Sequence, residues 1–382
     1  MRQRNLAAWL GLILTLGALT AGGCDTGIDP DSLVRELRIL GVRVSSGDPA
    51  DGPTAAELQA QLVPGAGGVD LAFTTSSVEL TTLVGAPTGP GRRFAARRPL
   101  QYDWFLCVGI RSLYSPGTLD PECRKFGPED EDPKTNRSLV YLNPVGTQST
   151  DGSGALSVPT DLLKGTLLAF LQTALAGGGQ GGGTGGTGSM LPTRPLSILL
   201  PILLRVSAVG GSPADNRDSE VGYNYLRVII AAPLLGIPLP PPNHNPVLAV
   251  VLGSAQADTT LQPLSPCTGG GAVCTPYAVP RSQGTFLKGY ALLATEETYD
   301  ALDDSGRTGI TETLRFSWFA SDGEFSQLRT GTAQPQTQWR DGDKYPTPPE
   351  TSTVSLWLVV QDERGGIDWQ QDELKLQDAP GG

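Results

Sequence analysis

The sequence predicts a mainly β protein made of two antiparallel β-sandwich domains, the first with an inserted amphipathic helix and a Gly-rich loop. Short segments of alternating apolar and polar residues recur along the chain, separated by turns rich in Gly, Pro and Asp. Each half has an aromatic segment near its start and a long, regularly alternating pair of segments near its end. A proline-rich stretch, residues 233–246, separates the halves as a stiff linker would.

Alternation predicts the strands of the first half, and the aromatic segment QYDWFLCV places Trp104 and Cys107 in or beside its core. Proline cannot donate to a ladder, so Pro201 is expected at the edge or start of its strand. The predicted strands are 37–44, 58–63, 69–73, 101–108, 197–209 and 220–231.

Residues 160–175 depart from the β pattern and predict a helix. Pro159-Thr160-Asp161 can cap a helix. One helical face carries Leu163, Leu167, Phe170, Leu171 and Ala174. Nine glycines in residues 177–188 follow, a composition typical of a flexible loop. Residues 183–188 match the G-x-G-x-x-G spacing, but a helix precedes them and Leu191-Pro192 follows, so they do not predict a dinucleotide site.

The second half repeats the pattern and ends in a hairpin that turns at residues 362–366. Trp318 and Trp357 are expected in its core. Trp339 and Trp369 have more polar neighbours, which fits either exposed sugar platforms or partly buried edge residues. Its predicted strands are 247–252, 284–293, 311–320, 352–361 and 367–376.

Two segments of this half, LRFSWFASDGEF at 314–325 and STVSLWLVVQDERGG at 352–366, resemble bacterial immunoglobulin-like repeats of the PKD and cadherin kind. The resemblance covers about residues 244–378, and YDWFLCVG at 102–109 extends it weakly to the first half. It implies tandem immunoglobulin-like domains over 33–235 and 247–378, joined by the linker 236–246 and followed by the tail 379–382. Cadherin-like relatives often bind calcium through turn carboxylates, which makes calcium an alternative to plain solvated turns; no complete ligand motif is present, so we expect no metal. The carboxylates concerned are Asp303, Asp304, Asp322 and Asp362.

The first 24 residues have the layout of an export signal. Arg2 and Arg4 precede an apolar run over 6–19, and small residues lead to Cys24. The segment resembles the bacterial lipoprotein signal, although Ala21 stands where that signal usually has Leu. The resemblance implies removal of residues 1–23, lipidation of Cys24 with palmitate-type acyl chains, and a tether over 24–32. An ordinary signal peptide or an uncleaved anchor is the alternative.

Assigning Cys24 to lipid leaves four cysteines, an even set that fits two disulfides in an exported protein. Four cysteines allow three pairings, and nearest-neighbour pairing keeps each bridge within one domain. Zinc is disfavoured because the chain has no C-x-x-C pair and one histidine. The expected disulfide residues are Cys107, Cys123, Cys267 and Cys274.

The net charge of −11, which becomes −13 when Arg2 and Arg4 are removed, disfavours nucleic acid as a partner. No nucleophile elbow, H-E-x-x-H pair or Walker loop occurs. His244 lies in the proline-rich linker, a poor place for a general base, and we expect it to be a linker residue that makes local turn bonds. We therefore expect a non-enzymatic lipoprotein of the cell envelope that binds or scaffolds, with the membrane and an envelope protein or glycan as partners and no cofactor. A carboxylate-based hydrolase and a purely structural spacer are the alternatives. The inner membrane, the outer membrane and the cell surface all remain open.

Overall fold

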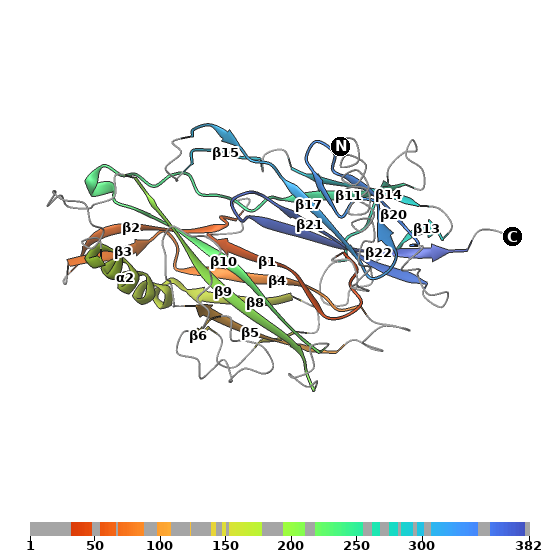
Figure 1. Cartoon of the computed structure of the whole chain (residues 1–382), viewed down its shortest axis with the longest axis horizontal. Helices are drawn as coiled ribbons and strands as arrows, with labels where there is room; N and C mark the ends of the chain where they lie inside the picture. The colour runs from red at the N-terminus through yellow and green to blue at the C-terminus, as the bar shows by residue number, and fades with distance from the viewer. Residues whose placement is uncertain are drawn as a thin grey trace, which may run out of the picture. The chain divides into compact units, whose positions relative to one another are not determined.

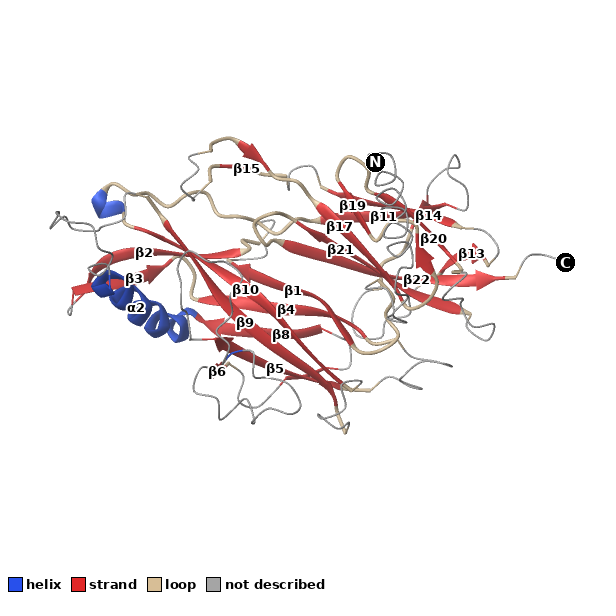
Figure 2. Cartoon of the chain, viewed as in Figure 1, coloured by secondary structure: helices blue, strands red, loops and turns tan. Residues whose placement is uncertain are grey.

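A computed structural model of the chain forms one compact unit over Ser32–Gly382. It is mainly β, as the sequence predicts, with one long helix among the described residues (Figures 1 and 2). Every ladder between named strands lies either within residues 38–231 or within residues 248–377. The structure describes residues 32–47, 54–65, 68–87, 98–107, 123, 139–142, 147–149, 153–177, 194–210, 218–254, 262–267, 275–281, 284–292, 296–301, 307–342 and 352–378.

The first group of strands forms two sheets that face each other across an apolar core. The smaller sheet has the order β1-β4-β8, with β1 (Arg38–Ser46), β4 (Ser77–Gly85) and β8 (Ser153–Pro159). The larger has the order β3-β2-β10-β9-β5-β6, and β7 also pairs with β5. All pairs in the group are antiparallel except β10 with β2. The strands of the larger sheet are β3 (Gly68–Phe73), β2 (Glu57–Gly65), β10 (Ser219–Ala231), β9 (Leu196–Ala208), β5 (Leu100–Cys107), β6 (Leu139–Tyr141) and β7 (Thr147–Ser149).

Side chains join the two sheets of this group where backbone ladders do not. On β10, the Asn224 amide donates to the Val42 carbonyl of β1 at 2.6 Å, and the Glu220 carboxyl accepts from the Ile39 amide of β1. Burial raises the pKa of Glu220 to about 7. A Cβ at Gly154 of β8 would lie 2.3 Å from the Tyr102 ring of β5, so glycine permits this close approach of the sheets.

The predicted helix is confirmed as α2 (Thr160–Gly177), which lies against β3 (Figure 1). The Thr160 hydroxyl donates to backbone carbonyls just before β4 and fixes the start of the helix. Leu163, Leu167 and Leu171 are buried in the core of the first group, as their spacing predicts. The Gly-rich loop 178–188 lies outside the described residues.

The second group also forms two facing sheets, with the orders β12-β11-β14-β20-β18 and β13-β22-β21-β17-β19, and a separate pair β15-β16. The pair β13 with β22 is parallel. A short 3-10 turn, η4 (Pro233–Leu235), precedes the group. Its strands are β11 (Leu248–Ser254), β12 (Gln262–Pro263), β13 (Tyr277–Pro280), β14 (Thr285–Ala291), β15 (Thr298–Tyr299), β16 (Ile310–Thr311), β17 (Arg315–Ala320), β18 (Glu324–Phe325), β19 (Arg329–Gly331), β20 (Gln336–Arg340), β21 (Thr353–Gln361) and β22 (Ile367–Gln377).

Trp104, Trp318 and Trp357 are buried, as predicted. Trp339 is buried as well, which corrects the expectation of an exposed or edge position. Its indole donates to the backbone carbonyl of Asp322 at 2.8 Å, and this residue lies 17 positions earlier in the chain, so the polar neighbours of the tryptophan in sequence do not reveal its burial. Trp369 is half-buried.

Pro201 lies inside β9 and not at its edge or start, so that expectation was wrong. It pairs with Tyr225 of β10, while the ladder of β9 with β5 stops at Ile202. Because β5 pairing has ended there, the missing amide hydrogen removes no bond from that ladder.

A buried apolar seam joins the two groups of strands. Its core includes Val34 and Leu83 from the first part of the chain and Trp357 and Ile367 from the second. The Val34 amide also donates to the Ala320 carbonyl at 2.8 Å. The seam holds the two groups of strands together. The division of the chain into two domains, with its boundaries, stays a prediction.

Candidate functional site

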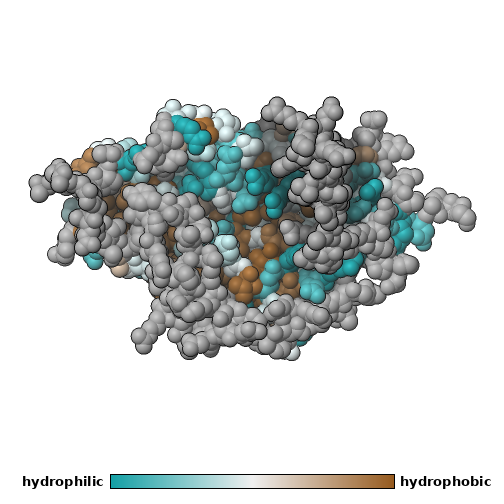
Figure 3. Space-filling model, viewed as in Figure 1, coloured by the Kyte–Doolittle hydropathy of each residue, from teal (hydrophilic) through white to brown (hydrophobic). Residues whose placement is uncertain are grey.

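A cavity of about 730 Å³ lies where β2, β10, the proline-rich segment, β15 and the turn between β21 and β22 meet. β15 lies near the top of the view in Figure 1, and the described surface in the same part of Figure 3 is mainly hydrophilic or neutral. The cavity combines a wall of proline rings with charged side chains from both groups of strands. Its lining comprises Glu57, Pro195, Arg227, Pro238, Leu239, Pro240, Pro241, Pro242, His244, Glu296, Glu297, Thr298, Tyr299, Asp300 and Arg364.

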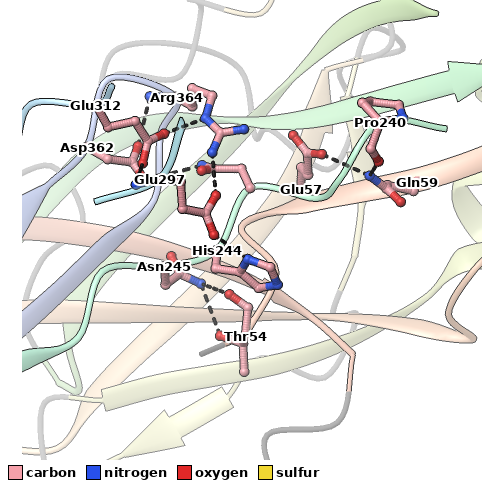
Figure 4. Close-up of polar contacts among 11 residues, drawn as sticks. Thr54, Glu57, Gln59, Pro240, His244, Asn245, Glu297, Glu312, Asp362 and Arg364 are labelled. Carbon is pink, nitrogen blue, oxygen red and sulfur yellow. Dashed lines mark hydrogen bonds and ion pairs between the residues drawn. The ribbon is translucent and has the colours of Figure 1, made fainter. Parts of the chain in front are cut away.

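Two buried asparagines hold the proline-rich segment in place. The side-chain amide of Asn245 donates to Thr54 (Figure 4). It also donates to the Val44 carbonyl at 2.8 Å, and the side-chain oxygen of Asn245 accepts from the Ile367 backbone amide at 2.9 Å. The Asn243 carbonyl accepts from the Ala56 amide at 2.7 Å. The predicted linker is therefore packed against both groups and forms a fixed wall.

Arg364 organises the charged side of the cavity. Its guanidinium donates to Glu312 and to Glu297 (Figure 4). It also stacks over the Tyr299 ring, 4.6 Å from the centroid. The Glu312 side chain is 0% exposed and that of Arg364 is 9% exposed. Burial raises the pKa of Glu312. Burial acts to lower the pKa of Arg364, but the two glutamates outweigh it and raise that pKa.

The hairpin turn that carries Arg364 is built around Asp362. The Asp362 carboxylate accepts from the backbone amides of Arg364 at 2.8 Å and Gly366 at 2.7 Å, and from the Asn243 side chain at 3.2 Å. Gly365 has a positive φ of 101°, a conformation that favours glycine. A Cβ at Gly366 would lie 2.2 Å from the Asp362 carboxylate, so a side chain there would displace the turn.

Glu57 faces the cavity from the start of β2. Its carboxylate accepts from the Gln59 side chain at 3.2 Å, and the same Gln59 amide donates to the Pro240 carbonyl at 3.0 Å (Figure 4). The residue is 3% exposed, and this burial raises the pKa of its carboxyl group. Glu57 thus serves the cavity and the attachment of the proline-rich wall.

Arg227 reaches the same cavity from β10. Burial lowers the pKa of its guanidinium, and the Glu57 charge acts in the opposite direction. Its Nε is buried and has no hydrogen-bond partner among the described residues.

His244 was expected to be a linker residue making local turn bonds. The structure instead brings its Nδ1 to the carboxylate of Glu297, 53 residues further along the chain. Its side chain lines the cavity and is 36% exposed. The cause is the packing of the proline-rich segment, which the sequence pattern does not reveal.

Two of the four calcium candidates, Asp322 and Asp362, lie in the described part of the chain, and each has its own surroundings there. Asp362 is engaged by its own turn and by Asn243, and Asp322 is fully buried beside Trp339. Asp303 and Asp304 lie outside the described residues. Within the described ranges, no group of three or more His, Cys, Asp or Glu side chains is placed to hold a metal ion.

Cys107 and Cys123 form a disulfide, with Cα atoms 5.9 Å apart, which is the nearest-neighbour pairing. It packs with Phe105, Leu139 and Leu203 in a small core of its own. The second bridge stays a prediction, since Cys274 lies outside the described residues. Cys24 and the whole signal segment lie outside them too. In the part of the chain that is described, no helix has both the length and the apolar character needed to cross a membrane.

Sequence reasoning did not find the charged residues that line or support the cavity. Glu57, Arg227, Glu297 and Arg364 line it and Glu312 supports Arg364; the five come from five segments, and none belongs to a recognisable motif. The sequence did contain one signal. Arg364 is the one cation in the turn 362–366, where it follows two carboxylate residues and precedes two glycines.

Comparison with known proteins leaves the chain without a family. No family model matches it, and no curated protein matches it. A solved structure titled "Crystal structure of dimeric latent PorU from Porphyromonas gingivalis" is similar at 10% identity with a TM-score of 0.19. The match covers 94% of this chain and 25% of that one, so the chain spans about a quarter of the length of the structure it matches. The fold and cavity define the chain as a mainly β protein with paired sandwiches and a mixed apolar and charged site.

Proposed function

We propose that this chain is a membrane-anchored lipoprotein of the cell envelope with a binding or scaffolding role through tandem immunoglobulin-like domains. Anchoring rests on the signal-like segment that ends at Cys24. Each buried methylene of an acyl chain contributes about 0.8 kcal/mol, so several chains on one cysteine are enough for a stable anchor.

The binding role rests on one observation, the cavity lined by residues from both groups of strands. Its volume is in the range typical of small-molecule and peptide-end sites. Its walls are held by buried hydrogen bonds of Asn243 and Asn245 and by the ion pairs of Arg364. A cavity with walls fixed in this way costs little conformational entropy when a ligand enters.

The alternative functions fit the cavity less well. A carboxylate-based hydrolase requires two carboxylates that act on one substrate bond. On the cavity wall, Glu297 is already paired with Arg364 and His244. Glu57 is a buried carboxylate with a raised pKa, and the described lining residues supply no second buried carboxylate to act with it. A pure spacer has no need for an arginine in a cavity wall. The proposed partner is an envelope protein or a glycan, and the acidic net charge disfavours nucleic acid.

Comparing the native protein with a Cys24→Ala variant in intact cells tests the anchor. We expect the native protein to incorporate labelled palmitate and to fractionate with membranes, and the variant to do neither. Protease treatment of whole cells then separates a surface location, where the folded chain is digested, from a periplasmic one, where it is protected. A variant that stays membrane-bound to the same extent contradicts the lipoprotein proposal.

A further inference from the structure

Arg227 differs from the other arginine that lines the cavity. Arg364 donates to two glutamates, whereas the Arg227 guanidinium makes no hydrogen bond or ion pair with any group that the structure describes. Its Nε is fully buried, so water does not satisfy that donor.

The surroundings of Arg227 do not supply the missing partner. Glu57 attracts it electrostatically but is bonded to Gln59 and forms no ion pair with it. An arginine held in a partly dehydrated wall without a partner is costly, because the charge loses hydration and gains no hydrogen bond. Such a group is expected where the partner arrives with a ligand.

The other residues that line the cavity indicate what the rest of the ligand is like. Pro238, Pro240, Pro241 and Pro242 line it, and prolines lose no side-chain entropy on contact with a ligand. The carboxylates of Glu57, Glu296 and Asp300 also line the cavity. They repel a multiply charged group such as phosphate more strongly than a group with a single negative charge.

We infer that the cavity binds a carboxylate carried by a small, largely apolar ligand, with Arg227 as the residue that pairs with it. A planar guanidinium matches a carboxylate through two parallel hydrogen bonds. The carboxylate belongs either to a free organic acid or to the carboxyl terminus of a peptide. This inference rests on the binding role proposed above and is independent of the lipid anchor.

Calorimetric titration of the detergent-solubilised full chain tests the inference with four probes. These are the tripeptide acetyl-Ala-Pro-Phe, its carboxyl-terminal amide, hexanoate and hexanamide. We expect saturable binding of at least one acid and at least about tenfold weaker binding of its amide. Binding of the peptide acid alone identifies a peptide end as the ligand, and binding of hexanoate alone identifies a small acid.

Arg227→Gln is expected to weaken binding of the acid at least about tenfold, and Arg227→Lys to weaken it less, because lysine keeps the charge and loses the two-pronged geometry. Arg340→Gln is the matched control, since Arg340 is exposed and pairs with Glu324 away from the cavity. Without ligand, Arg227→Gln is expected to raise the Tm, because a partly buried charge with an unpaired, buried Nε is removed.

Three results each overturn the inference: equal binding of acid and amide, equal binding by wild type and Arg227→Gln, or no saturable binding of either acid up to 10 mM probe. A lowered Tm of both Arg227 variants also overturns it, because the arginine is then a structural residue. Loss of membrane attachment in the Cys24→Ala variant is scored separately, so failure of this inference and failure of the anchor are distinguishable.

Discussion

Asp372 is a buried carboxyl group outside the cavity. It is 1% exposed on β22, and its carboxylate accepts from the Gln370 amide group at 2.9 and 3.1 Å. Burial raises its pKa to about 6, as burial raises that of Glu220 to about 7. A carboxyl with a raised pKa in the folded state binds its proton more tightly there than in the unfolded chain. These two groups therefore favour folding below about pH 4, and this contribution is lost as the pH rises through 6 and 7.

We predict that Asp372→Asn raises the free energy of unfolding at pH 7.5 by on the order of 2 kcal/mol and leaves it nearly unchanged at pH 4. The amide keeps an acceptor for Gln370 and carries no charge. Denaturant unfolding at the two pH values measures the difference. Glu79→Gln, at an exposed position on β4, is the control and is expected to change neither value. An equal effect of Asp372→Asn at both pH values contradicts the assigned ionisation.

The buried ion pairs of Arg364 contribute more to the free energy of unfolding than ion pairs on the surface do. Removal of Arg364 leaves Glu312 buried with a charge and no counter-ion, which costs about 3–5 kcal/mol. Removal of Arg340, which is 58% exposed and pairs with Glu324, costs about 0–1 kcal/mol. We predict that Arg364→Ala lowers the free energy of unfolding more than Arg340→Ala does, and denaturant unfolding of the two variants measures the difference. Similar losses in both variants contradict the buried network.

At the scale of elements, α2 depends on the leucine face that docks on the first core. We predict that Leu167→Ala, at a fully buried position, lowers the free energy of unfolding by about 2–5 kcal/mol. Leu162→Ala lies on the same helix with 44% of the residue exposed and is expected to cost under about 1 kcal/mol. Chemical denaturation followed by circular dichroism measures both. A larger loss for Leu162→Ala than for Leu167→Ala would contradict the assignment of the leucine face that packs against the sheets.

The sequence predicted α2, β5, β9, β10, β21 and β22 because each shows a clear period of 3.6 or 2 residues. It did not predict β4, whose alternation contains two threonines, or β20, whose polar run QTQWR conceals the buried Trp339. Pairing also escaped prediction. The parallel contact of β10 with β2 joins residues about 170 positions apart, and periodicity carries no information on such partners.

The cavity was beyond sequence reasoning for a related reason. Glu57, Arg227 and Arg364 are ordinary surface-type residues in their local sequence, and their burial depends on how the proline-rich segment packs. The same packing moved His244 from an expected local role to a contact with Glu297. Burial of charge depends on tertiary packing, and a single sequence does not display it.

For the whole molecule, the seam predicts that the described halves unfold together. Val34, Leu83, Trp357 and Ile367 share one buried cluster, and Asn245 bonds to both β1 and β22. We predict a single calorimetric transition, coincident with the change in tryptophan fluorescence. Ile367→Ala is expected to lower that one Tm, while Leu328→Ala, exposed on the second half, leaves it unchanged. Two separated transitions in the native protein contradict a coupled pair.

The central claim at this scale is that residues from both groups of strands form one binding cavity. Photocrosslinking in intact cells tests this central claim most directly. A photoreactive residue replaces Thr298, an exposed residue on the cavity rim, or Thr353, an exposed residue at the start of β21 away from the cavity lining. The account predicts a discrete adduct from position 298 in the membrane fraction, lost in Arg227→Gln, and no such adduct from position 353. No adduct at 298, or the same adducts at both positions, would contradict a binding role for this cavity.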